Sequence, residues 1–189
     1  MNRAVAILIL IVVLCVGGLF LYFKFGGATL INKDLSTLVL SSEDVMYPLL
    51  SEGYQSVEEV ADAFMVSEYQ LEQWGYNKGY ASFFGSPERP MVASGAYRFL
   101  SVDGAISAFH ESESKSSLNP KWEKLTSEKH ILSILSVEIS GYERSTWRYY
   151  SDGDTYYSVT FRKANIIVGV NARSLQNAEM YARILEERI

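Results

Sequence analysis

The sequence predicts an α+β fold: a single N-terminal transmembrane helix followed by an antiparallel β-sheet domain of about six strands covered by helices. Three observations lead to this fold class. An uncharged apolar run occupies residues 4–23, helix-start residues recur at Ser56, Asp103 and Ser174, and alternating apolar and polar residues fill much of the second half. Strands joined by short turns favour antiparallel pairing, and the intervening helices must cover the sheet.

The apolar run at residues 4–23 predicts a transmembrane helix. Twenty helical residues span roughly 30 Å, the thickness of the hydrocarbon core. A secretory signal usually has a shorter apolar region of about 7–15 residues. Small residues at 16–18 and 26–28 nevertheless leave signal-peptide cleavage open as an alternative. We expect the helix to be retained as an anchor.

Four residues of this segment are candidates for anchoring and helix packing. Tyr22 and Lys24 fit the membrane–water interface, where aromatic rings and snorkelling lysines set the depth of a helix. Gly17 and Gly18 permit close packing against another helix, although helix flexibility explains the pair as well.

Charge and cysteine usage predict where the rest of the chain lies. The flanking charges nearly balance, so they give little orientation signal. The one cysteine lies inside the apolar run, and a cysteine-free remainder suits an oxidising compartment. We therefore expect a single-pass protein of the cell membrane whose domain is extracytoplasmic.

Residues 25–36 are predicted as a tether and residues 37–189 as one domain. Without Arg3 and Lys24 the chain holds 15 basic and 22 acidic residues, a net charge of −7 against −5 for the whole. This acidity excludes a nucleic-acid partner, which needs a basic face.

The first helix of the domain is predicted to begin after Ser56. Ser56 and Glu59 form a capping-box pair ahead of apolar residues at helical spacing. Before this helix, residues 37–40 are strand-like and residues 41–44 favour a short helical turn. After it, Ser67 restarts or extends the helix.

The middle of the domain is predicted as two strands and two helices. Aromatic residues and glycines over 76–85 favour a strand, and 91–101 favours a second strand paired with it. Asp103 is predicted to cap a helix running to about residue 114. Asn119-Pro120 is predicted to begin a short helix.

The last part is predicted as a four-strand meander and a helix. Alternating apolar residues mark the four strands at 135–140, 144–151, 154–162 and 166–170. Asp152-Gly153 is the predicted turn of the central hairpin, and Ser174 the predicted start of the helix. Glu179 and Arg183 form an expected ion pair on that helix.

A family resemblance rests on short stretches that together cover about residues 40–110, the first beginning at Leu38. They are Leu38–Val45, Trp74-Gly75-Tyr76 with Gly79-Tyr80, and Tyr97-Arg98-Phe99 with Gly104-Ala105 and Ala108-Phe109. These stretches resemble uncharacterised bacterial membrane-anchored or lipoprotein extracytoplasmic domains. The order of elements is also similar to the extrinsic PsbP-type α/β/α fold, whose known members are accessory proteins of larger machines. Neither resemblance implies catalytic residues, and a fold alone does not imply a function.

Residue patterns with catalytic or metal-binding chemistry are scarce. His110 and Glu113 stand one helical turn apart and can bind a metal from one face, but a solvated polar helix face is the favoured explanation. Ser112 and Lys115 match only the bare S-x-x-K pattern. Asp152-Gly153-Asp154 suits a hairpin turn as well as part of a calcium loop. We expect no catalytic residue, no cofactor and no metal site.

Arginine and aromatic residues are frequent between 142 and 157, a mixture typical of protein interfaces. The candidate interaction surface consists of Arg144, Arg148, Tyr150 and Tyr156. Strand alternation sends Trp147 and Tyr149 to one face of the sheet and Arg148 and Tyr150 to the other. Core packing of the aromatic residues is the alternative.

These observations favour a non-enzymatic accessory subunit that presents its domain to a membrane protein complex. The second hypothesis is a small-ligand or glycan-binding sensor domain that uses a cleft between helix and aromatic sheet. A hydrolase with spatially paired carboxylates is a third hypothesis, because such pairing is invisible in a sequence.

Overall fold

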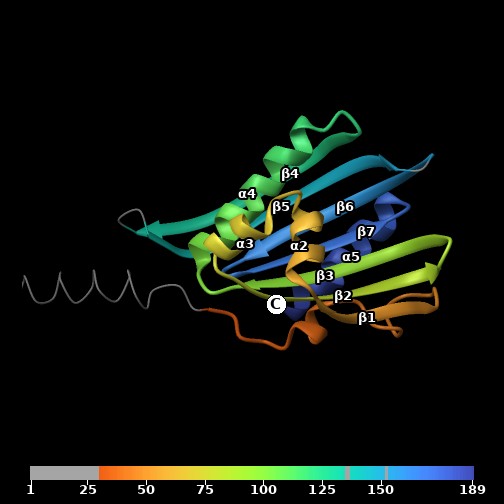
Figure 1. The fold of residues 1–189 in the computed structure, drawn as a ribbon, viewed down its shortest axis with the longest axis horizontal. Helices are drawn as coiled ribbons and strands as arrows, with labels where there is room; N and C mark the ends of the chain where they lie inside the picture. The colour runs from red at the N-terminus through yellow and green to blue at the C-terminus, as the bar shows by residue number, and fades with distance from the viewer. Residues whose placement is uncertain (1–29, 135–136, 152) are drawn as a thin grey trace, which may run out of the picture.

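An antiparallel sheet organises the domain (Figure 1). The structure is a computed structural model and describes residues 30–134, 137–151 and 153–189. Within these residues the sheet has seven strands in the order β1-β2-β3-β7-β6-β5-β4. The strands are β1 (Leu49–Gln55), β2 (Tyr76–Ser86), β3 (Arg89–Phe99), β4 (Trp122–Ile134), β5 (Val137–Ser151), β6 (Asp154–Lys163) and β7 (Ile166–Ala172). The α+β class and the antiparallel sheet are therefore as predicted, with seven strands in place of about six.

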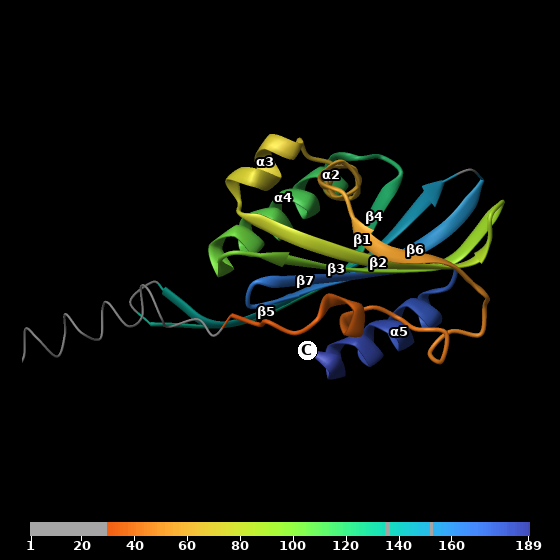
Figure 2. The same ribbon diagram turned by 60° about the horizontal axis from the view of Figure 1, so that its bottom comes forward.

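Helices cover both faces of the sheet (Figure 2). The elements on one face are α2 (Val57–Phe64), α3 (Glu68–Gln73) and α4 (Val102–Leu118). The opposite face carries the 3₁₀ helix η1 (Leu35–Leu38) and the C-terminal helix α5 (Leu175–Arg188). The result is a layered α/β/α arrangement.

The chain reaches the far edge of the sheet through α4. Strands β1, β2 and β3 form consecutive antiparallel pairs, and α4 then leads to β4 at the opposite edge. From there β4, β5, β6 and β7 return strand by strand, so that β7 pairs with β3. This route joins the two halves of the chain at the centre of the sheet.

Two hydrophobic clusters hold the layers together, one on each face. The cluster under α5 includes Leu38, Phe84, Val168, Tyr181 and Leu185. The cluster under α2, α3 and α4 includes Val60, Phe64, Leu71, Phe99 and Phe109. Strand β7 contributes to both because successive side chains point to opposite faces.

Capping residues place most helices where the sequence predicted them. The Ser56 hydroxyl accepts from the Glu59 amide at 3.2 Å and the Glu59 carboxylate accepts from the Ser56 amide at 2.7 Å, which confirms the capping box. Ser67 caps α3 and Ser174 caps α5. The cap of α4 is Ser101, whose hydroxyl accepts from the Gly104 amide; the prediction of Asp103 was wrong by two residues.

The predicted strand at 37–40 was wrong. Residues 35–38 form η1, because the Asp34 carboxylate accepts from the Ser36 amide and caps the turn. Leu35 and Leu38 then lie three residues apart on one side and are both buried. Leu35 belongs to the core although the sequence assigned it to the tether, so the folded part of the chain begins before residue 37.

The predicted short helix after Asn119-Pro120 was also wrong, since β4 begins at Trp122. The sequence of β4 shows no alternating apolar pattern, because β4 is an edge strand whose residues through 131 are mostly exposed. Strand β1 was missed for the same reason.

The runs predicted at 135–140 and 144–151 belong mainly to one long strand, β5, with residues 135–136 outside the described residues. The hairpin turn at Gly153, whose φ is +81°, is confirmed.

The predicted transmembrane segment lies outside the described residues, together with Gly17, Gly18, Tyr22 and Lys24. Among residues 30–134, 137–151 and 153–189, no helix is both long and apolar enough to cross a bilayer.

Candidate functional site

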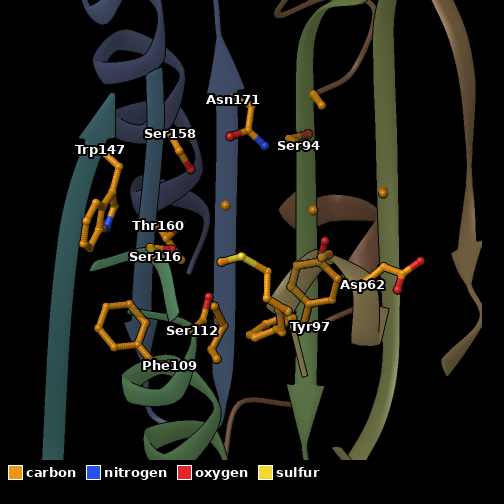
Figure 3. Close-up of a pocket in the computed structure, with 18 of the residues that line it drawn as sticks. Asp62, Ser94, Tyr97, Phe109, Ser112, Ser116, Trp147, Ser158, Thr160 and Asn171 are labelled. Carbon is orange, nitrogen blue, oxygen red and sulfur yellow. The ribbon is translucent and has the colours of Figure 1, made fainter. Parts of the chain in front are cut away.

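A cleft lies between the sheet and the helices α2 and α4 (Figure 3). Its cavity volume is about 540 Å³, within the range of about 300–1,000 Å³ that is typical of small-molecule sites. Helices α2 and α4 form its walls, and the neighbouring strands β2, β3, β7, β6 and β5 form its floor. The cleft therefore spans segments from both halves of the sequence.

The floor is hollow because small residues meet across five strands. Strand pairing places them in one line, which we call the small-residue row: Ala81, Gly95, Gly169, Thr160 and Ser145. A Cβ atom added at Gly169 would meet only Thr160 Oγ1, at 3.6 Å, so the space above this glycine is open. A Cβ atom at Gly95 would lie 2.4 Å from the Tyr97 hydroxyl, because the Tyr97 ring lies over that glycine.

Polar side chains line the next row of the floor. Asn171 on β7 pairs in register with Ser158 on β6, and Ser158 with Trp147 on β5. Ser158 is 7% exposed, and Ser116, which faces the cleft from α4, is 5% exposed. Within the described part of the chain, the side chains of Ser116, Ser158, Thr160 and Asn171 make no hydrogen bond to another residue. Figure 3 shows all four around the same hollow.

Helix α4 presents a stripe of residues to the cleft. Phe109, Ser112, Glu113 and Ser116 recur at helical spacing and line the cavity together. A second group of residues on α2 completes the opposite wall, with Phe64 packed edge-on against Tyr97 at 5.1 Å between ring centroids. Each wall therefore consists of polar and aromatic side chains that lie on one face of its helix.

Aromatic rings form one end of the cleft. Trp147 is 4% exposed and packs edge-on against Trp122 at 6.3 Å between ring centroids. Trp122, Tyr149 and Tyr156 stack on adjacent strands, at 4.3 Å and 5.3 Å. Burial raises the pKa of Tyr149 to about 12, so its hydroxyl stays neutral at physiological pH.

The charged residues of the lining are acidic. Glu59 and Asp62 stand on α2, and Glu113 stands on α4. Among the described residues that line the cavity, none is lysine, arginine or histidine. The ammonium group of Lys124 lies just beside the lining, 2.8 Å from the Glu113 carboxylate and 5.3 Å from the centroid of the Trp147 ring.

A buried ion network fixes α4 to the sheet beside the cleft. Glu143 contacts Arg162 at 3.0 Å, His110 at 2.9 Å and Lys129 at 2.6 Å. Burial alone would raise the pKa of Glu143, but Lys129, His110 and Arg162 outweigh it and lower the pKa to about 2. Arg162 is fully buried and also donates to the Ala164 carbonyl. His110, considered above as a metal ligand, is therefore a partner of the Glu143 carboxylate in this network.

The structure separates the residues of the predicted interaction surface. Arg144 forms ion pairs with Glu179 and Glu186 of α5. Arg148 pairs with Glu123, and Tyr150 is 49% exposed. These three residues lie on the α5 side of β5, as alternation predicted for Arg148 and Tyr150.

Tyr156 lies on the opposite face, stacked on Tyr149, and accepts a hydrogen bond from Arg173. The four predicted residues therefore do not form one surface. Glu179, which we expected to pair with Arg183, contacts Arg144 in its place.

The patterns considered for catalysis or metal binding do not converge. His110 contacts Glu143, and Glu113 contacts Lys124. Lys115 pairs with Glu111, leaving Ser112 in the cleft wall without it. Asp154 is engaged by Arg89 and Arg173. The described residues contain no group of three or more His, Cys, Asp or Glu side chains placed to hold a metal ion.

Comparison with known proteins shows a fold likeness. Neither a family model nor a curated protein matches the sequence. The extracellular domain of PknH from Mycobacterium tuberculosis is similar in structure, with a TM-score of 0.51 and 13% identity over 86% of this chain and 98% of that chain.

A protein of unknown function from Pseudomonas aeruginosa, PA94, described as a putative regulator, gives a TM-score of 0.36 and 9% identity. That match covers 57% of this chain and 77% of the other and is too weak to support an argument. The likeness to PknH shows that this chain has the fold of a known extracellular domain. The PsbP-type resemblance stays a prediction.

Proposed function

We propose that this chain is a membrane-anchored extracytoplasmic domain that binds a small ligand in the cleft between α2, α4 and the sheet, without catalysing a reaction. The observation that supports binding is the polar lining of the cleft, on its floor and on the α4 wall. Ser116 and Ser158 are buried and hydrogen-bond to no other described side chain or backbone group. Neither hydroxyl oxygen is among the fully buried, unpartnered side-chain atoms of the described residues, so both remain open to water or to a ligand in the cleft. A ligand that occupies the cleft must hydrogen-bond to them, because enclosing a polar group without a partner is costly.

Two observations support the extracytoplasmic location. The fold is similar to an extracellular domain, and residues 4–23 have the length and composition of a membrane span. Labelling of a Ser36→Cys variant in a Cys15→Ser background tests the location. We expect an impermeant thiol reagent to label Ser36→Cys in sealed cells; protection until the membrane is opened would contradict it.

A role within a membrane protein complex is supported by a different surface. Tyr150 and Arg148 are placed on the side of β5 that faces away from the cleft, with the guanidinium carbon 6.0 Å from the tyrosine ring centroid. Tyr150 is exposed and Arg148 is half-buried and paired with Glu123, and Arg and Tyr side chains are frequent in interfaces. Native-gel separation after mild-detergent extraction tests this role. We expect the wild-type chain to co-migrate with a larger assembly and the Arg148→Ala variant to lose that co-migration. Migration of the wild-type chain alone would contradict the role.

Ligand binding is tested by melting the full chain in detergent against a panel of small molecules. A ligand that binds only the folded state raises the melting temperature. The control is Gly169→Leu, which fills the open space above the small-residue row. We expect at least one compound to stabilise the wild type and not this variant; stabilisation that survives Gly169→Leu for every active compound would place binding elsewhere.

A further inference from the structure

We infer that the ligand of the cleft is an organic cation, an amine with an apolar body. This inference rests on the proposed function and specifies the chemistry of its ligand. Three features of the cleft support it: the sign of its charges, the position of a lysine of the protein itself, and the kind of polar groups on its floor.

The charged residues of the cleft lining disfavour the binding of an anionic ligand. Glu59, Asp62 and Glu113 are acidic, and no basic residue is among the described lining residues. Among the lining residues a carboxylate or phosphate would find no charge-assisted donor, although such donors give the strongest hydrogen bonds to anions. The cation beside the lining, Lys124, is already paired with the Glu113 carboxylate. The cleft therefore favours a ligand that is cationic or uncharged.

The protein itself shows how an ammonium group fits at the aromatic end. Lys124 of β4 reaches across so that its Nζ lies between the Glu113 carboxylate, at 2.8 Å, and the face of Trp147, at 5.3 Å. A carboxylate combined with an indole face is a favourable environment for a cation. Glu113 and Trp147 both line the cavity, whereas Lys124 does not. An ammonium group arriving from the cavity can thus reach the same two partners.

The polar side chains of the floor and of the α4 wall add acceptors without adding positive charge. Ser116, Ser158 and Thr160 offer hydroxyl oxygens, and Asn171 offers an amide oxygen. An ammonium group has three donors and no acceptor, so it needs oxygens of this kind. The buried serines are independent of the acidic residues and face the same cavity.

Lys124 is consequently an internal competitor of the ligand. Its side chain is 38% exposed, so it can swing into solvent when another cation takes its place. Removing its ammonium group should strengthen the binding of an external amine, and removing the Glu113 carboxylate should weaken it.

The experiment measures the affinities of the full chain in lipid nanodiscs for three probes of similar shape by titration calorimetry. The probes are 2-phenylethylamine, 2-phenylethanol and 3-phenylpropionate. We expect the amine to bind about tenfold more tightly than the alcohol, as a desolvated cation–π contact implies, and the propionate to bind most weakly.

Variants at the aromatic end sharpen this test. Lys124→Met should raise the affinity for the amine about fivefold, which is part of the binding free energy that a cation–π contact supplies. Lys124→Arg keeps the positive charge and should leave the affinity unchanged. Glu113→Gln should remove the preference for the amine over the alcohol. Gly169→Leu should abolish binding of both.

Alcohol binding as tight as amine binding, with both lost in Gly169→Leu, would overturn the cation inference and leave the proposed function intact. Amine binding that Lys124→Met does not strengthen would also overturn it. If the panel and these probes show no binding that depends on Gly169, the proposed function fails.

Discussion

At the scale of single residues, Glu143 shows how a buried charge is tolerated. Glu143 is 3% exposed, and its carboxylate contacts Lys129 of β4, Arg162 of β6 and His110 of α4. The pairing outweighs the cost of burial, which is why the pKa falls to about 2 from its ordinary value of 4.5. Because α4 is one wall of the cleft, this contact also fixes the wall.

We predict that Glu143→Gln destabilises the chain, because it removes the carboxylate that neutralises the buried Arg162. The expected loss is about 3 kcal/mol, as for other broken buried pairs. Denaturant unfolding of the full chain in detergent measures it. Glu128→Gln, at an exposed position of β4, is the control and should change little. Equal stability of the two variants would contradict the prediction.

The same residue predicts the acid sensitivity of the fold. A carboxyl group with a lowered pKa stabilises the folded state above its unfolded pKa and loses that effect as the pH falls toward the folded pKa. The contribution of Glu143 should therefore fade between pH 4.5 and about 2. We expect melting temperatures of the wild type to fall more steeply through this range than those of Glu143→Gln. Parallel curves would exclude Glu143 as the cause.

Two glycines allow a matched test of packing. A Cβ atom at Gly104 would lie 1.9 Å from the Trp74 carbonyl oxygen, so α4 must move to admit it. We predict that Gly104→Ala costs about 3 kcal/mol, the upper range of overpacking. Gly169→Ala meets its nearest atom at 3.6 Å and should cost little. Thermal melting measures both variants, and we expect the melting temperature of Gly104→Ala to be clearly lower than that of Gly169→Ala. Equal melting temperatures would contradict this account of Gly104.

At the scale of elements, the capping box of α2 holds the wall opposite α4. We predict that Ser56→Ala costs about 1 kcal/mol, because it leaves the Glu59 amide without its cap. Ser117→Ala, at an exposed position within α4, is the control and should not destabilise the chain. The free energy of unfolding measures both. A loss of the same size in Ser117→Ala would contradict the role of the cap.

Elements with strong local signals could be predicted from the sequence, and those set by distant contacts could not. The Ser56–Glu59 box and the Gly153 hairpin are local, and both are confirmed. Strand β4 could not be predicted because an edge strand lacks the buried side that produces alternation. Its pairing with β5 depends on residues more than twenty positions away in places, such as Glu123 and Arg148.

At the scale of the whole molecule, the cleft was expected only in general terms, as a cleft between helix and aromatic sheet. The faces of Trp147 and Tyr149 followed from alternation. The small-residue row could not be predicted, because strand register alone brings Gly95 and Gly169 together. Glycines and serines on separate strands carry no signal of their own until the order of strands is known.

The central claim is that the cleft between α2, α4 and the sheet binds the ligand. Amide hydrogen exchange of the full chain, with and without the most stabilising compound of the panel, tests it most directly. We predict slower exchange in α4 around Ser112 and Ser116 and in β7 around Gly169 and Asn171. Protection confined to α5 and η1, on the other face of the sheet, would contradict the claim.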